Sequence, residues 1–203
     1  MTLSEILALI PNGTQGLIFD LDGTLADTMP IHIQAWERTG VHFGVPITGD
    51  LVNEYAGAPS HEVLKSWNDR FGWNVDIQEG KEMKTSLYYE LLDELGCVEP
   101  IQLVYDVMVH YYGSLPMSIG TGSNKYSASR VIKMIGADKF IKDVVSADDV
   151  TNHKPYPETF LKCAELMNVD ATKCLVFEDG PMGVMAAQNA NMRTIYLPEF
   201  ELI

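Results

Sequence analysis

Short apolar runs alternate with helical patterns over most of the second half of the chain, and this alternation restricts the fold more than any other feature. A similar run, Gly16–Phe19, lies near the start of the chain and stops at an aspartate. Runs of this length bounded by turn residues are typical of buried strands, and the segments between them have the spacing of amphipathic helices. The other predicted strands are Leu115–Gly120, Val144–Ala147, Lys173–Phe177 and Arg193–Leu197.

Strands that alternate with helices form parallel sheets with right-handed crossovers. The sequence therefore predicts an α/β protein with a Rossmann-like parallel sheet. Residues 30–99 depart from this pattern, because their apolar side chains recur only at helical spacing. We interpret them as a small antiparallel helical bundle inserted after the first strand. The predicted core is then formed by residues 1–29 and 100–203.

Polar and charged residues follow four of the predicted strands. In open parallel sheets, ligands bind outside the carboxyl ends of the strands, so residues at these ends should converge on one rim. The residues are Asp20 and Asp22 after the first strand, Thr121, Gly122 and Ser123 after the second, Lys154 in the loop after the third, and Glu178 and Asp179 after the fourth.

These residue types fit the transfer of a phosphoryl group. A phosphate monoester repels an attacking carboxylate, so a divalent cation must neutralise the two. Mg²⁺ prefers hard oxygen ligands, which Asp20 and Asp179 can supply. Lys154 would add a second positive charge, and Thr121–Ser123 at a helix start would hold the remaining phosphate oxygens. Asp22 could protonate the leaving oxygen and later take a proton from water.

Four segments resemble the four motifs of the haloacid dehalogenase superfamily. Phe19–Thr28 reads FDLDGTLADT and is similar to the first motif, DxDGTLxD followed by Ser or Thr. Thr121 resembles the second motif, Lys154 the third, and the Glu178-Asp179 pair the fourth. The motifs occur in the correct order and span essentially the whole chain. Within the superfamily, the chain resembles the β-phosphoglucomutase-like branch and its bacterial fructose-1-phosphate phosphatases.

The resemblance implies a role for each acidic residue. Asp20 would be the nucleophile and a ligand of Mg²⁺. Asp22 would be the general acid and base, with its backbone carbonyl also on the metal. Asp179 would bind Mg²⁺, and Glu178 would be a ligand or a close neighbour of the ligands.

The resemblance also implies how the substrate is held. Thr121, together with Gly122 and Ser123, would bind the transferring phosphoryl group, and Lys154 would bind it and restrain the nucleophile. Residues 30–99 would be the helical cap that closes over the site. Such closure excludes water and helps to select the substrate.

Two further residues are candidates for contact with the substrate. His32 could contact the substrate from the predicted cap, although a histidine on an amphipathic helix is most often structural or exposed. Asp27, at the edge of the first motif, could contact a substrate hydroxyl. The remaining histidines show no metal-ligand spacing, so we assign no role to His42, His61, His110 and His153.

The charge of the chain restricts its partners. The net charge is −14, with 14 basic residues against 28 acidic ones, which disfavours nucleic acid and anionic membranes. The absence of a long apolar run and of a basic leader, with three scattered cysteines, favours the cytoplasm. We expect a small-molecule phosphate ester as the partner and a monomer or weak dimer.

Three other functions remain to be weighed against hydrolysis. A mutase needs a cation for a second phosphate, and the arginine that related mutases carry in the cap loop is missing from Gly57–His61. Dehalogenases work without Mg²⁺ and lack an acid at the position of Asp22. A catalytically inactive binding module on the same fold would usually lack the nucleophile or a metal-binding carboxylate, and all of these residues are present here. The sequence therefore predicts a Mg²⁺-dependent phosphatase that forms a phospho-aspartate on Asp20. A sugar phosphate is the favoured substrate, and a β-phosphoglucomutase-type mutase is the alternative.

Overall fold

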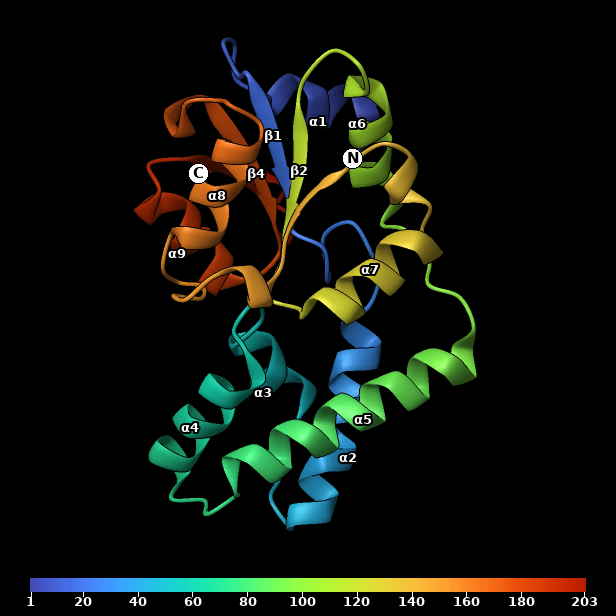
Figure 1. The fold of residues 1–203 in the computed structure, drawn as a ribbon, viewed down its shortest axis with the longest axis vertical. Coiled ribbons are helices and arrows are strands. Elements are labelled where there is room, and N and C mark those ends of the chain that lie inside the picture. Colours follow the sequence, from blue (N-terminus) through green and yellow to red (C-terminus); the bar gives the residue numbers. More distant parts are fainter.

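Six strands form one sheet in the computed structural model, which describes all of residues 1–203 (Figure 1). The strand order is β3-β2-β1-β4-β5-β6, so β1 lies in the middle of the sheet. Strands β1 to β5 are parallel and β6 is antiparallel to β5. The strands are β1 (Gly16–Phe19), β2 (Met117–Gly120), β3 (Asp143–Val145), β4 (Cys174–Glu178), β5 (Arg193–Tyr196) and β6 (Glu201–Leu202).

Helices cover both faces of the sheet, because the side chains of a strand alternate between the faces. Leu17 and Phe19 join one apolar cluster, and Ile18 joins the other. Burial of such a side chain contributes about 1.5–3 kcal/mol. The first face is covered by α1 (Leu3–Leu9), α6 (Gln102–Tyr111) and α7 (Lys125–Met134), and the second by α8 (Glu158–Leu166) and α9 (Pro181–Asn189).

The register of the sheet brings the ends of the central strands to one level. Phe19 of β1 pairs with Ile119 of β2 on one side and with Phe177 of β4 on the other. The residues that follow these positions, Asp20 and Glu178 among them, therefore lie side by side at the carboxyl edge of the sheet.

Four helices form a separate layer beyond this edge (Figure 1). They pack around their own apolar cluster, in which the Trp36 and Trp67 rings meet edge to face. The C-terminal part of α5, with Tyr88 and Leu92, joins the main core instead. The helices are α2 (Met29–Phe43), α3 (Gly49–Glu54), α4 (Ser60–Phe71) and α5 (Ile77–Leu95). We call them the cap; its limits at residues 30 and 99 stay a prediction.

The predicted fold class is confirmed, with two differences in detail. Helix α1 was not expected, although Thr2 and Glu5 form a capping box that the sequence spacing already allows. The sheet is not wholly parallel, because the two-residue strand β6 returns along β5. Such a short edge strand has too few residues to show an alternating pattern. None of the helices has the combination of length and apolar character that a membrane span requires.

Candidate active site

Lys154 lies between two carboxylates at the carboxyl edge of the sheet. Its Nζ donates to Oδ1 of Asp20 and to Oε1 of Glu178, at 2.6 Å in both cases. All three side chains are buried, and Lys154 is only 1% exposed. Charge-assisted hydrogen bonds in a dry environment are short and strongly directional. Lys154 therefore fixes the orientation of the carboxylate that ends the central strand.

Asp179 completes a group of three carboxylates beside this lysine. Oxygen atoms of Asp20, Glu178 and Asp179 lie within 4.8 Å of one another. Thr24 Oγ1 donates to Oδ1 of Asp179 at 3.0 Å, and the backbone N–H of Gly180 donates to Oε2 of Glu178 at 2.7 Å. Hard oxygen donors of this kind are the ligands that Mg²⁺ prefers. The donor set therefore fits Mg²⁺.

Crowding raises the pKa of two of these carboxyl groups. Burial raises the pKa of Asp20 well above its usual value, and the charges of Glu178 and Asp179 add to this against the attraction of Lys154. Burial and then Glu178 raise the pKa of Asp179 to about 7. Burial disfavours the charge of Lys154, but Asp20 and Glu178 outweigh burial and raise the pKa of Lys154. One ammonium does not balance three carboxylates, so the site favours a further cation.

Asp22 is held by hydroxyl groups of the core and by a histidine of the cap. Its Oδ1 accepts from Thr28 Oγ1 at 2.7 Å and lies 3.2 Å from Nε2 of His32. Its Oδ2 accepts from Ser123 Oγ at 2.6 Å and from Thr121 Oγ1 at 3.3 Å. Burial opposes the charge of Asp22, but His32, Ser123 and Thr28 outweigh burial and lower its pKa. Asp22 is therefore a carboxylate in this arrangement.

His32 connects Asp22 to a buried lysine of the cap. Nζ of Lys84, which is 8% exposed, lies 2.9 Å from Nδ1 of His32. An ammonium can only donate, so we assign Nδ1 as the acceptor and Nε2 as the nitrogen that donates to Asp22. Burial and Lys84 lower the pKa of His32, which fits this neutral form. Burial lowers the pKa of Lys84 to about 8. The cap thus controls the environment of Asp22.

The loop between α3 and α4 rests directly on the core. A Cβ atom at Gly122 would lie 2.5 Å from the carbonyl oxygen of Gly57, and one at Gly180 would lie 2.7 Å from that of Ala56. Only glycine, which has no Cβ, allows the backbone of the cap loop and the backbone of the core to approach this closely. The cap is therefore closed onto the core in this structure.

Cap and core together enclose a cavity of about 410 Å³. This volume lies in the range that is typical of sites for small molecules. The core side includes Asp20, Asp22 and residues 121–124, and the cap side includes His32, Trp36, Tyr55, Lys81, Lys84 and Tyr88. The carboxylate that Lys154 orients thus faces a cavity whose opposite wall belongs to the cap.

The structure brings together every residue expected at the site except Asp27. Asp20, Lys154, Glu178 and Asp179 form the ionic cluster, and Asp22 lies beside it but points to Thr28 and His32. Thr121, Gly122, Ser123 and His32 line the cavity.

Asp27, in contrast, is exposed and does not line the cavity. Its neighbours Ala26 and Thr28 are fully buried. The substrate contact that was expected of Asp27 is therefore not found in this arrangement.

The sequence interpretation missed the contacts made by Thr28, Lys84 and Thr24. Thr24 and Thr28 belong to the first motif, where hydroxyl groups recur beside the aspartates. Lys84 lies one turn before Tyr88 on the buried face of α5, and a lysine on such a face is the signal that could have identified it.

Comparison with known proteins agrees with this geometry. A family model described as "Haloacid dehalogenase-like hydrolase" matches residues 17–197. Fructose-1-phosphate phosphatase YqaB from Escherichia coli is 37% identical over 180 residues, which cover 89% of this chain and 94% of that protein. A phosphorylated carbohydrates phosphatase from Thermotoga maritima is 30% identical over 187 residues, which cover 90% of this chain and 84% of that protein.

A solved structure of β-phosphoglucomutase from Clostridium difficile has the same fold. It superposes with a TM-score of 0.78 at 24% identity and covers 90% of this chain and 83% of that one. The match of the family model over most of the chain and the identity to the Escherichia coli phosphatase lead to one conclusion. The chain belongs to the haloacid dehalogenase-like hydrolases.

Proposed function

We propose that this enzyme hydrolyses small sugar phosphates with the help of Mg²⁺, by way of a phosphoryl group held covalently on Asp20. One observation carries the proposal: the buried carboxylate of Asp20 is fixed by Lys154 at 2.6 Å and faces a cavity between cap and core. Asp20 and Asp179 would hold Mg²⁺, with Glu178 as a third ligand or close neighbour and the backbone carbonyl of Asp22 as a further one. Bound Mg²⁺ would supply the positive charge that lets a carboxylate approach a phosphate.

In the first step, a carboxylate oxygen of Asp20 forms a bond to phosphorus while the bond from phosphorus to the sugar oxygen breaks. Lys154 stabilises the charge on the transferring group. The hydroxyl groups of Thr121 and Ser123 hold its oxygens. Asp22 gives a proton to the leaving sugar oxygen.

Asp22 must take up a proton before it can act as this acid. In the present structure, hydrogen bonds from Ser123 and Thr121 help to keep it ionised. The same hydroxyl groups are proposed to bind the phosphoryl group. Substrate binding would then remove them from Asp22 and raise its pKa toward the value that an acid needs.

In the second step, water attacks the phosphorus of the phospho-aspartate, and the bond from phosphorus to Asp20 breaks. Asp22, now a carboxylate, takes a proton from that water. Inorganic phosphate leaves and Asp20 is regenerated. Asp22 has the ionised form that this role requires, because its proton left with the sugar in the first step.

The choice of a sugar rests on the cavity and on the relatives. Ser60 and Thr85 contribute hydroxyl groups to the cap wall, where they can bind the hydroxyl groups of a sugar. Two of the relatives are named as phosphatases of fructose 1-phosphate and of phosphorylated carbohydrates.

The test is to measure inorganic phosphate and remaining sugar phosphate with and without Mg²⁺. The panel is fructose 1-phosphate, glucose 1-phosphate, glucose 6-phosphate and, as a non-sugar control, phosphoserine. We expect one phosphate released per sugar phosphate consumed, faster for a sugar than for phosphoserine, and no turnover in EDTA. Turnover that is undiminished in EDTA would contradict the proposal.

A mutase is the second candidate, because Lys81 of the cap also lines the cavity and could hold a second phosphate in place of the missing arginine. Isomerised sugar phosphate without release of phosphate would identify it. The cytoplasmic location, the monomer or weak dimer, and the exclusion of nucleic acid and membranes stay predictions from charge and composition.

A further inference from the structure

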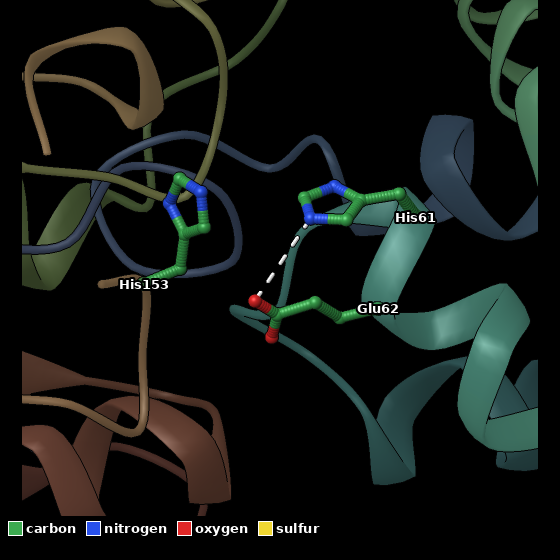
Figure 2. Close-up of side chains that lie close together, drawn as sticks. All are labelled: His61, Glu62 and His153. Carbon is green, nitrogen blue, oxygen red and sulfur yellow. Dashed lines mark ion pairs between the residues drawn. The ribbon is translucent and has the colours of Figure 1, made fainter. Parts of the chain in front are cut away.

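Two histidines and a glutamate meet where the cap touches the core, outside the carboxylate cluster. His61 and Glu62 lie in the first turn of α4, and His153 lies on the core loop that leads to Lys154. One ligand atom of each lies within 4.8 Å of the others. Figure 2 shows the three side chains pointing into the space between α4 and this loop.

Neither imidazole is engaged in a hydrogen bond. Nε2 of His61 is 3.9 Å from Oε1 of Glu62, which is longer than a hydrogen bond. Nδ1 of His153 is buried and has no partner. The two rings lie edge to face with their centroids 5.8 Å apart. An unpaired buried nitrogen is costly, so the sequence would be expected to avoid this arrangement unless it has a use.

The donor set differs in kind from the carboxylate cluster. Imidazole nitrogen suits the late first-row transition metals, whereas Mg²⁺ is bound by oxygen. Two histidines and one carboxylate with an open position form a common set of three protein ligands for Zn²⁺. The net charge of −14 favours any cation at the surface.

We propose that His61, Glu62 and His153 form a second metal site, selective for a divalent transition cation such as Zn²⁺, which links the cap to the core. Ligand distances of about 2.0–2.2 Å place tetrahedral ligand atoms about 3.3 Å apart. The three atoms would therefore have to approach one another by about 1.5 Å or less, starting from 4.8 Å. The side chains of His61 and Glu62 are 45% and 43% exposed, so their rotation allows such a movement toward His153.

The proposed site has a consequence for the cavity. His61 and His153 both line it, one from the cap and one from the core. A metal bound to both would hold the cap in the closed position, and a cap that cannot open would trap product or exclude substrate. Zn²⁺ would then inhibit turnover without occupying the Mg²⁺ site.

The direct test is binding of metal to the whole chain, and it does not depend on the proposed function. Zn²⁺ is titrated by calorimetry, and Co²⁺ by its visible absorption, in saturating Mg²⁺ that occupies the carboxylate cluster. We expect one equivalent of each metal and a Co²⁺ spectrum of nitrogen coordination. The changes His61→Gln and Glu62→Gln should each weaken binding by at least about tenfold.

The chain offers a matched control for these changes. His42 also lies 3.9 Å from a glutamate, Glu79, and is exposed to a similar degree, but no third ligand stands beside it. His42→Gln should leave the binding of Zn²⁺ and Co²⁺ unchanged. Binding that is equal in all variants, or too weak to saturate, would overturn the site.

The inhibition of turnover by Zn²⁺, which rests on the proposed function, is measured separately in saturating Mg²⁺. Each variant is compared with its own rate without Zn²⁺. Glu62→Gln should raise the inhibiting concentration by at least tenfold and His42→Gln should not change it. Equal inhibition of both variants would mean that Zn²⁺ acts at the carboxylates, and would overturn the link between this site and cap movement.

Discussion

The core and cap sides of the cavity hold their charged groups in different ways. On the core side, Lys154 and three carboxylates are placed by adjacent strands and by one loop, and the ion pairs are 2.6 Å long. On the cap side, Lys84 and His32 come from two different helices and reach the core only through Asp22.

In the proposed mechanism, the core and the cap therefore have different tasks. The core would supply the groups that make and break bonds to phosphorus, with Asp20 and Asp179 directly after strands and Lys154 on a loop. The cap contacts Asp22, the proposed acid and base, through His32, and it rests on the core at Gly122 and Gly180.

Changing Asp20 to Asn should have the largest effect and should test the core side of the comparison. Removal of the nucleophile is expected to lower kcat by at least about 10³-fold, because the remaining site can bind but cannot accept phosphorus. Steady-state phosphate release measures it. Asp27→Asn is the control, since Asp27 is exposed and should keep full activity. Equal rates for the two variants would remove Asp20 from the mechanism.

Replacement of Lys154 by Met should have the second largest effect on the rate. The variant lacks the charge that faces the transferring group, so kcat should fall by about 10²–10³-fold at saturating Mg²⁺. Lys162→Met is the control, because Lys162 also pairs with a carboxylate, at 2.9 Å, but is 40% exposed. If both variants have the same rate, the buried ion pair of Lys154 with Asp20 does not contribute to catalysis.

Changing Lys84 to Met tests the cap side. We expect about a tenfold lower kcat, since His32 would lose the donor that orients it toward Asp22. The rate of the unchanged enzyme should fall as pH rises through about 8, where Lys84 loses its proton, and this decline should be absent in the variant. Lys65→Met, an exposed lysine of α4, is the control. A pH–rate profile of the variant that matches the unchanged enzyme would argue against a role for the cap in the chemistry.

The smallest effect is expected in thermal stability. Because the pKa of Asp179 is raised to about 7 from its usual 3.8, the metal-free folded protein holds a proton that the unfolded chain loses. The contribution of Asp179 to stability therefore falls as pH rises from about 4 to about 7. Mg²⁺ should offset this loss, and at 100 times its Kd it should raise Tm by about 5–10 °C near pH 7.5 and by less near pH 5.

Asp179→Asn provides the control for this measurement. Without the carboxylate, both the fall in stability and the gain from Mg²⁺ should become smaller. The same Mg²⁺ effect at both pH values, or in both proteins, would show that the carboxylate cluster does not hold the metal.

The same contrast explains what could be predicted from the sequence. Asp20 and Asp179 directly follow strands, and Lys154 lies in the loop after β3, so recognition of the strands and of the motifs was enough to bring them together. The contact of His32 with Lys84 joins residues on two helices, and helical spacing alone does not fix how two helices face each other. The exposure of Asp27 could not be predicted for a related reason, because its direction depends on the buried neighbours Ala26 and Thr28. The pairing of His61 with His153 across the cap and core had no signal in spacing at all.

The most direct measurement of the central claim is to quench the enzyme with acid during turnover of fructose 1-phosphate and to locate the phosphoryl group by mass spectrometry of its peptides. We expect an acid-trapped phosphoryl group on the peptide that contains Asp20, and none in Asp20→Asn. Borohydride should reduce the acyl carbon of this phospho-aspartate to a primary alcohol, with release of phosphate. Steady release of phosphate with no phosphorylated peptide, or with the group on another residue, would contradict the claim.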